Sequence, residues 1–162
     1  MSALDEIRSA NDRFASEFQQ GDLPMPPGRR LAVVTCMDAR LDPAAFLGLG
    51  LGDAHVIRNA GGVVSDDALR SLVISHELLG TQEAVVIAHT GCGMLTFTND
   101  DLHERLGPEA ESVDFLPFPD LEESVRASAR KIEESPLLPD SFGVTGFVYE
   151  VETGRLRPVE LD

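Results

Sequence analysis

The first residues with chemical potential follow an apolar stretch in the first third of the chain. Residues 31–35 have the composition of a buried strand, and they run directly into Cys36, Asp38 and Arg40. In an extended chain alternate side chains point to the same face, so these three side chains would lie on one side. They would stand at the carboxyl end of a strand, where open α/β sheets bind their ligands. A strand that served only the core would not need this ending.

A second apolar stretch, residues 83–88, ends in the same manner. His89 and Cys92 follow it, three positions apart in a glycine-rich turn. With Cys36 they offer two thiolates and an imidazole, a donor set that suits Zn²⁺ in tetrahedral geometry. Catalytic zinc sites use three protein ligands where structural sites use four, so the count predicts a catalytic zinc. The alternative is that each cysteine is a small core residue, but the chain places its only two cysteines at two strand ends.

Asp38 and Arg40 would lie beside this metal. Two thiolates cancel the charge of zinc and should make a bound water less acidic than three imidazoles would, so hydroxide would need assistance. As a carboxylate, Asp38 can accept a hydrogen bond from zinc-bound hydroxide and orient its lone pair toward a substrate carbon. Arg40 can hold Asp38 through a two-pronged ion pair. Without the metal ligands, the two residues would be interpreted as a surface ion pair or a turn at a strand end.

The two motifs, Cys36-x-Asp38-x-Arg40 and His89-x-x-Cys92, resemble the signature of the β-class carbonic anhydrases in order and spacing. The resemblance implies an enzyme, a carbonate dehydratase of the lyase class. Such an enzyme hydrates carbon dioxide reversibly to bicarbonate and a proton by means of zinc-bound hydroxide. The resemblance implies the same three zinc ligands and the same pair of Asp38 and Arg40. It also implies a closed state in which Asp38 is the fourth ligand.

The resemblance covers most of the chain, from about residue 24 to residue 151. The sequence Val-Ile-Arg-Asn-Ala-Gly at 56–61 is similar to the segment between the two motifs in that family, and the short chain is closest to its compact prokaryotic branch. Three residues are candidate substrate contacts. Arg58 would either neutralise an anionic product or brace the edge of the site, and the backbone N–H groups around Gly61 and Gly91 would face substrate oxygens.

Two alternatives use the same metal site. The first is a hydrolase that acts on carbonyl sulfide or carbon disulfide, which would differ from a carbon dioxide hydratase only in the width and lining of the entry channel. The second is a zinc-binding sensor or interaction module without turnover. The presence of both Asp38 and Arg40 favours an enzyme over such a module.

Composition limits the partners of the protein. Its 162 residues predict a single domain, 1–162. The excess of 28 acidic over 13 basic residues gives a formal charge of −15, which argues against nucleic acid and against an anionic membrane surface. No apolar run approaches the ~20 residues that cross a membrane, and the N-terminus lacks a basic and then apolar segment, so a cytoplasmic location is expected. Two cysteines fit that compartment as thiolates rather than as a disulfide.

Helices and strands alternate along the chain. Their order predicts a three-layer α/β fold in which helices flank a mainly parallel central sheet with an antiparallel edge strand. Right-handed crossovers would bring both metal-bearing strand ends to the same edge. The expected strands are 31–36, 54–58, 83–88 and a hairpin at 143–159 with its turn at Thr153 and Gly154; the expected helices begin at Pro43 and cover 66–79, 99–106 and the segment from Leu121 to before Pro136.

Residues 1–28 are interpreted as an N-terminal helical arm with a proline-rich connector. An amphipathic helix over 3–20 is predicted by apolar residues at near-heptad spacing: Leu4, Ile7, Phe14 and Phe18. The stiff connector at 24–28 could carry this helix away from its own core, although packing on its own domain is the alternative. The family resemblance implies dimers with sites near the interface. We therefore expect a homodimer, or an oligomer built from dimers, in which the arm packs on the neighbouring subunit.

Overall fold

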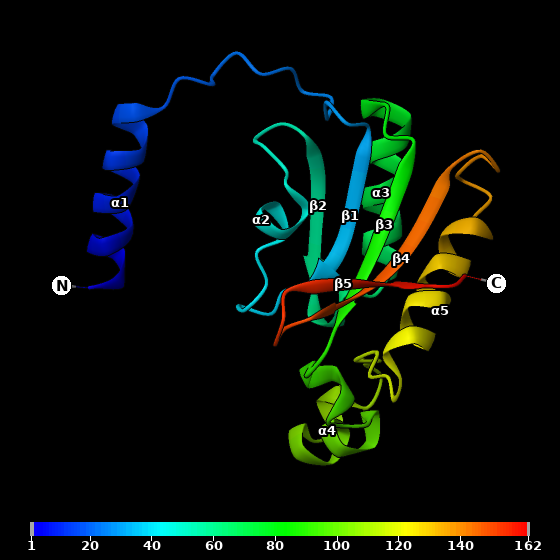
Figure 1. Ribbon diagram of the computed structural model, residues 1–162. Coiled ribbons are helices and arrows are strands. Elements are labelled where there is room, and N and C mark those ends of the chain that lie inside the picture. The colour runs from blue at the N-terminus through cyan, green and yellow to red at the C-terminus, as the bar shows by residue number, and fades with distance from the viewer. Residues whose placement is uncertain (1, 162) are drawn as a thin grey trace.

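A central five-stranded sheet organises the protein, in the strand order β2-β1-β3-β4-β5. The computed structural model describes residues 2–161. The first four strands pair in parallel and β5 pairs antiparallel with β4 (Figure 1). This confirms the predicted mainly parallel sheet with an antiparallel edge strand. The strands are β1 (Leu31–Cys36), β2 (Ala54–Asn59), β3 (Glu83–His89), β4 (Gly143–Glu150) and β5 (Arg155–Val159).

The helices begin and end within a few residues of the predicted positions. Side-chain caps set their starts: Ser65 accepts a hydrogen bond from the Ala68 N–H before α3, and Asp120 accepts one from the Glu123 N–H before α5. Each such cap is worth about 1 kcal/mol. The loop expected at 107–119 contains a short 3₁₀ turn. The helices are α1 (Ala3–Glu17), α2 (Pro43–Leu47), α3 (Asp66–Leu79), α4 (Asn99–Leu106) and α5 (Leu121–Glu133), with 3₁₀ turns at Ala60–Gly62, Gly93–Leu95 and Pro108–Ala110.

Both faces of the sheet are covered, so the protein has the predicted three layers. Helices α3 and α5 pack on one face, where Leu72 and Val125 join Val34 and Val86 of the central strands in one apolar core. On the other face α2 contributes Phe46, whose ring stacks on Tyr149 of β4 with 4.3 Å between centroids. The four consecutive residues 32–35 of β1 have no solvent exposure. Burial on both faces explains why this strand is a continuous apolar run rather than an alternating one.

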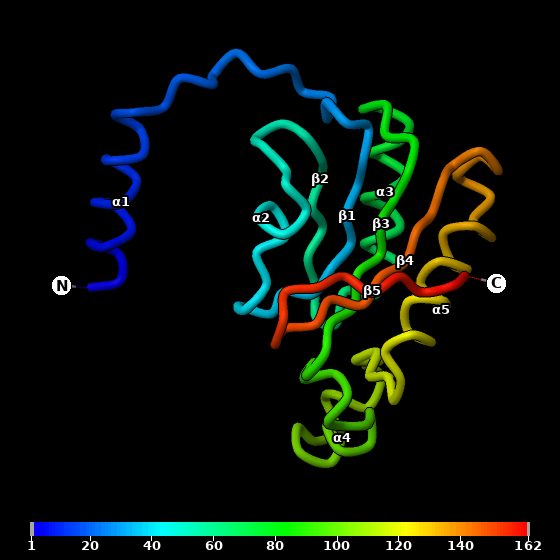
Figure 2. The backbone as a smooth tube through the Cα atoms, in the orientation of Figure 1, coloured from blue at the N-terminus to red at the C-terminus, as the bar shows by residue number. Residues whose placement is uncertain are grey.

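Helix α1 stands apart from the sheet, at the end of a long extended segment (Figures 1 and 2). None of its residues is buried. Phe14 and Phe18 contact each other, with ring centroids 5.3 Å apart, but they remain 62% and 42% exposed. The helix ends at Glu17 rather than at the predicted residue 20, because Phe18 adopts an extended conformation. The apolar face of α1 is therefore uncovered in the single chain.

No helix within residues 2–161 combines the length and the apolar character that crossing a membrane requires.

A close backbone contact fixes the end of β2 against the end of β1. Gly62, in the 3₁₀ turn after β2, has φ +64°, and a Cβ atom there would lie 2.7 Å from the Cys36 nitrogen and from the Thr35 carbonyl carbon. The turn is closed by Asn59, which donates to the Val63 carbonyl at 2.8 Å and accepts from the Val63 N–H at 3.1 Å. Only glycine fits at position 62, so this residue sets how closely the turn approaches Cys36.

We expect Gly62→Ala to lower the free energy of unfolding by about 3 kcal/mol, because it combines a left-handed backbone conformation with a collision against backbone atoms. Gly48→Ala is the matched control. Gly48 also has positive φ, +60°, but a Cβ atom there would have nothing within 4 Å, so it should cost only about 1–2 kcal/mol. Urea denaturation of both variants measures the difference. Equal losses would show that the contact with β1 is not tight.

Candidate metal centre

The three predicted metal ligands meet at the carboxyl edge of the sheet. Cys36 is the last residue of β1, His89 is the last residue of the neighbouring β3, and Cys92 precedes the 3₁₀ turn Gly93–Leu95. One ligand atom from each, the two sulfurs and an imidazole nitrogen, lie within 4.8 Å of one another, and all three residues are buried. Two segments more than fifty positions apart are thus joined into one cluster, as the parallel pairing of their strands predicts.

The imidazole of His89 is oriented for a metal ion. Its Nδ1 atom donates to the Thr90 carbonyl at 2.8 Å, and a carbonyl can only accept, so in the neutral ring the lone pair is on Nε2. The Nε2 atom is buried and has no hydrogen-bond partner among the described residues. A buried polar atom without a partner is costly and needs an explanation. A cation bound between His89 and the two cysteines supplies one.

The charges of the cluster also call for a cation. A hydrogen bond from Cys92 lowers the pKa of the Cys36 thiol to about 4, against the effect of burial. The pKa of Cys92 is raised, first by its bond to Cys36 and then by burial. Cys36 is therefore the thiol that ionises more readily. Burial acts against protonation of His89, but the neighbouring Cys36 and the Thr90 carbonyl outweigh it and raise its pKa. A divalent ion bound between the two sulfurs would stabilise both of them as thiolates.

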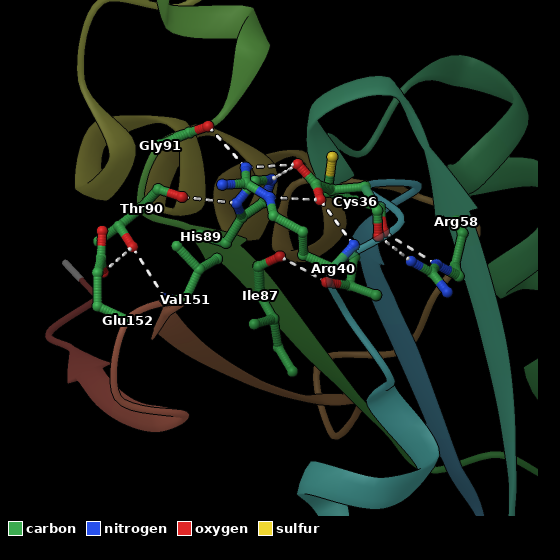
Figure 3. Close-up of polar contacts among 11 residues, drawn as sticks. Cys36, Arg40, Arg58, Ile87, His89, Thr90, Gly91, Val151 and Glu152 are labelled. Atoms are coloured by element: carbon green, nitrogen blue, oxygen red, sulfur yellow. Dashed lines mark hydrogen bonds and ion pairs between the residues drawn. The ribbon is translucent and has the colours of Figure 1, made fainter.

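Asp38 and Arg40 form the predicted two-pronged ion pair. Arg40 donates from Nε to one carboxylate oxygen at 2.9 Å and from Nη2 to the other at 2.7 Å. These bonds hold the pKa of Asp38 well below its usual range, and they raise the pKa of Arg40. Arg40 Nη2 also donates to the Gly91 carbonyl at 2.9 Å (Figure 3). The Asp38 carboxylate is thereby held 3.7 Å from His89 Nε2.

A turn, rather than strand alternation, brings Asp38 and Arg40 together. The strand ends at Cys36, so the expected alternation does not extend to the next residues. Instead the Arg40 N–H donates to the Asp38 carboxylate at 2.9 Å, and the Leu41 N–H donates to the Asp38 carbonyl at 3.1 Å. The turn and the ion pair that the sequence offered as alternatives to a functional role are both present beside the cysteine cluster.

The three candidate substrate contacts lie around this cluster. Arg58 donates to the carbonyls of Cys36 and Asp38, at 2.9 and 2.8 Å, which supports the bracing role. A backbone hydrogen bond from Gly61 contributes to the lowered pKa of Cys36. The carbonyl of Gly91 holds Arg40. Contact of these residues with a substrate stays a prediction.

Sequence reasoning missed two groups of residues at the site. Met94 and Phe118 form an apolar wall: a Cβ atom on Gly61 would lie 2.9 Å from Met94 Cγ and 2.8 Å from the Phe118 ring. Phe118 comes from a loop without periodicity, so no local pattern indicated its position. The second group is Thr90 with Glu152, whose side chains meet at 3.0 Å across 62 positions.

A three-residue sulfur and nitrogen cluster that could hold a metal ion thus lies at the ends of neighbouring parallel strands of an α/β protein, beside an ion-paired aspartate. The sequence profile of the family described as Carbonic anhydrase matches residues 31–114. Beta-carbonic anhydrase 1 of Mycobacterium tuberculosis is 48% identical, over 98% of this chain and 99% of that protein. The chain belongs to the β-carbonic anhydrase family, which confirms the resemblance and makes the protein an enzyme of that family.

Two further relatives are similar to the chain over nearly its whole length. The crystal structure of carbonic anhydrase from Streptococcus mutans superimposes with a TM-score of 0.92 and 49% identity, and the match covers 99% of both chains. A carbon disulfide hydrolase from Acidithiobacillus thiooxidans is 38% identical, over 98% of this chain and 91% of that protein. Proteins named for different substrates are thus similar to this chain over nearly its whole length.

Proposed function

We propose that the protein catalyses the reversible hydration of carbon dioxide to bicarbonate and a proton, with Zn²⁺ held by Cys36, His89 and Cys92. The observation that carries this proposal is the buried cluster, in which three ligand atoms lie within 4.8 Å and His89 Nε2 has no hydrogen-bond partner among the described residues. When bound, Zn²⁺ makes a coordinated water more acidic, as it does in carbonic anhydrases with three histidine ligands, and so supplies a nucleophile near neutral pH.

Asp38 is proposed as the residue that orients the attacking water. A carboxyl group with a strongly lowered pKa is a weak base, so Asp38 is unsuited to take up the proton. Its carboxylate can instead accept a hydrogen bond from the water and turn the lone pair of the water oxygen toward the carbon of the substrate. Arg40 contributes by fixing both carboxylate oxygens. The proton is then released to solvent or buffer.

The same geometry supports a closed state in which Asp38 is the fourth zinc ligand. The carboxylate lies 3.7 Å from His89 Nε2, the atom that would bind the metal, so Asp38 could join the ligand set if it moved toward the cluster. The two bonds from Arg40 oppose that movement. Arg40 therefore has a second proposed role, which is to hold Asp38 away from a metal bound at the cluster.

Hydrolysis of carbon disulfide or carbonyl sulfide is the second candidate. The similarity to a carbon disulfide hydrolase over 98% of the chain favours it, because these molecules also present a central electrophilic carbon. Carbon dioxide remains the first choice because the two carbonic anhydrases from M. tuberculosis and S. mutans share 48% and 49% identity with the chain, against 38% for the hydrolase. Parallel assays of hydration and of sulfide release distinguish the two.

We propose a cytoplasmic homodimer, or an oligomer built from dimers, in which residues 1–162 form one domain and 1–28 its arm. Support for the dimer comes from α1, which carries an apolar face but buries none of its residues. An exposed face of this kind favours association. The location is supported by the two cysteines, which are both free.

Cys92→Ser should bind Zn²⁺ at least about 100-fold more weakly than the parent, since loss of a ligand exceeds the 10–100-fold cost of losing a supporting contact. Zinc content after dialysis and the rate of carbon dioxide hydration by stopped flow measure this effect. Thr96→Ser, in the turn that follows, is the matched control and should resemble the parent. Full zinc content and parental activity in Cys92→Ser would exclude the assigned ligand set.

Arg40→Ala should lower kcat for hydration by about 10²–10³-fold, because it frees the carboxylate that orients the water. Asp38→Ala should retain zinc and lose activity to a similar extent. Arg40→Lys keeps the charge but not the two-pronged pair, so it should fall between the parent and Arg40→Ala. Zinc content is measured beside each rate. Parental activity in Arg40→Ala would show that the ion pair has no role in turnover.

Deletion of residues 1–20 should reduce the molecular mass in solution to that of a single chain, because it removes the uncovered apolar face of α1. Light scattering measures this mass. Within the full chain, Ile7→Glu should weaken association, whereas Arg8→Ala, on the same helix, should leave it unchanged. If the truncated chain keeps the oligomeric state of the parent, the arm packs within its own subunit.

A further inference from the structure

Thr90 is the residue through which the His89 ligand is joined to the neighbouring strand. Its N–H donates to the Tyr149 carbonyl at 2.9 Å, and its carbonyl accepts from His89 Nδ1 at 2.8 Å. Its hydroxyl accepts from the Val151 N–H at 3.0 Å and donates to the Glu152 carboxylate at 3.0 Å (Figure 3). Every polar group of this residue therefore has a partner, and one of these partners is a proposed zinc ligand.

The hydroxyl of Thr90 takes a position in the sheet that normally belongs to a carbonyl. In a parallel ladder, a residue that donates to one residue of the adjacent strand accepts from the residue two positions further along that strand. Thr90 donates to Tyr149, so a regular ladder would direct the Val151 N–H to the Thr90 carbonyl. That N–H binds the Thr90 hydroxyl instead. Because the hydroxyl accepts this hydrogen bond in place of the carbonyl, the Thr90 carbonyl is available to accept from His89.

Glu152 sets the direction of the hydroxyl. A carboxylate accepts hydrogen bonds, so the hydroxyl proton of Thr90 points to Glu152, and a lone pair of the hydroxyl oxygen remains for the Val151 N–H. Glu152 is exposed on the turn between β4 and β5, whereas Thr90 is half-buried. The bond to Glu152 is therefore the weaker part of the arrangement, and the bond to Val151 is the stronger part.

The next residue extends the effect to the ion pair. The carbonyl of Gly91 accepts from Arg40 Nη2 at 2.9 Å, so consecutive carbonyls of one turn hold the His89 ring and the Arg40 guanidinium. The directions of both carbonyls depend on the backbone conformation of this turn. The Thr90 hydroxyl holds the turn to the β4–β5 segment through Val151 and Glu152.

We propose that Thr90 is a positioning residue for the metal centre, which rests on the function proposed above. Its hydroxyl replaces its carbonyl in the sheet ladder, and the carbonyl is thereby available to hold His89 with Nε2 toward the two cysteines. Contacts that orient a metal-binding histidine typically change metal affinity by 10–100-fold when they are removed. Without the hydroxyl, the Val151 N–H would return to the carbonyl of residue 90 and compete with His89 Nδ1.

The experiment measures zinc affinity by competition with a chromophoric chelator at fixed pH, together with circular dichroism and the Tm of the metal-free forms. Thr90→Val removes the hydroxyl at nearly constant side-chain volume, whereas Thr90→Ser keeps a hydroxyl at this position. Thr153→Val is the matched control: the Thr153 hydroxyl also donates to a carboxylate, that of Glu150, at 2.8 Å and accepts from the Arg155 N–H at 3.3 Å in the same hairpin, but neither bond involves His89. The visible spectrum of the Co²⁺ forms reports ligand geometry independently of turnover.

We expect Thr90→Val to bind Zn²⁺ about 10–100-fold more weakly and to show an altered Co²⁺ spectrum, with Thr90→Ser and Thr153→Val like the parent. Equal affinity in Thr90→Val and the parent would overturn the proposal, since it would mean that one carbonyl serves both donors. Equal losses in Thr90→Val and Thr153→Val would also overturn it, because the effect would then belong to the hairpin. If Thr90→Val does not fold, Thr90→Ala takes its place, because it also removes the hydroxyl: a parental zinc affinity in Thr90→Ala overturns the proposal, and an about 10–100-fold weaker one supports it. Failure of the parent to bind zinc would instead refute the proposed function, and with it this role of Thr90.

Discussion

The parallel pairing of β1 with β3 is the constraint on which the site depends. Their register sets Thr35 opposite Ile87, which brings Cys36 and His89 to the same edge although they are far apart in the chain. The buried Thr35 hydroxyl adds a bond to the Ile87 carbonyl at 3.0 Å. A slip of one residue would turn the side chains of either strand to the opposite face. The apolar core under both strands therefore specifies the ligand geometry as well as stability.

Acidic and basic side chains lie next to one another at the site. Two thiol groups and an imidazole share a buried space that favours a cation, and Asp38 adds a carboxylate at its margin. Arg40 neutralises this carboxylate and keeps it ionised. In the proposed reaction the two tasks would be separate: the metal held by the cluster would activate a water, and the ion pair would orient it. Neither task requires Asp38 to change its protonation state near neutral pH.

Most of the fold and the centre of the site could be predicted from the sequence, for physical reasons that can be named. Buried strands are continuous apolar runs, and caps such as Ser65 mark helix starts, so local pattern sufficed for these elements. The clustering of the candidate ligands could be predicted because Cys36 and His89 end two such runs. The replacement of the Thr90 carbonyl by its hydroxyl in the sheet hydrogen bonds was not predictable, because it depends on a bond to Val151, which directly follows the neighbouring strand. Phe118 was missed for the same reason, since its place beside Gly61 has no local signal.

The detached helix α1 should make the helix content of the protein depend on protein concentration. An isolated helix of about 15 residues is only marginally stable in water, because the cost of nucleation is barely recovered over so few turns. Helix α1 has a capping box at Ser2 but buries none of its residues, so its own chain adds little to its stability. In the proposed dimer, ordering of the arm and association would be one thermodynamic event. Dilution would then melt α1 before it affects the sheet, and helix content would follow mass action rather than the stability of the core.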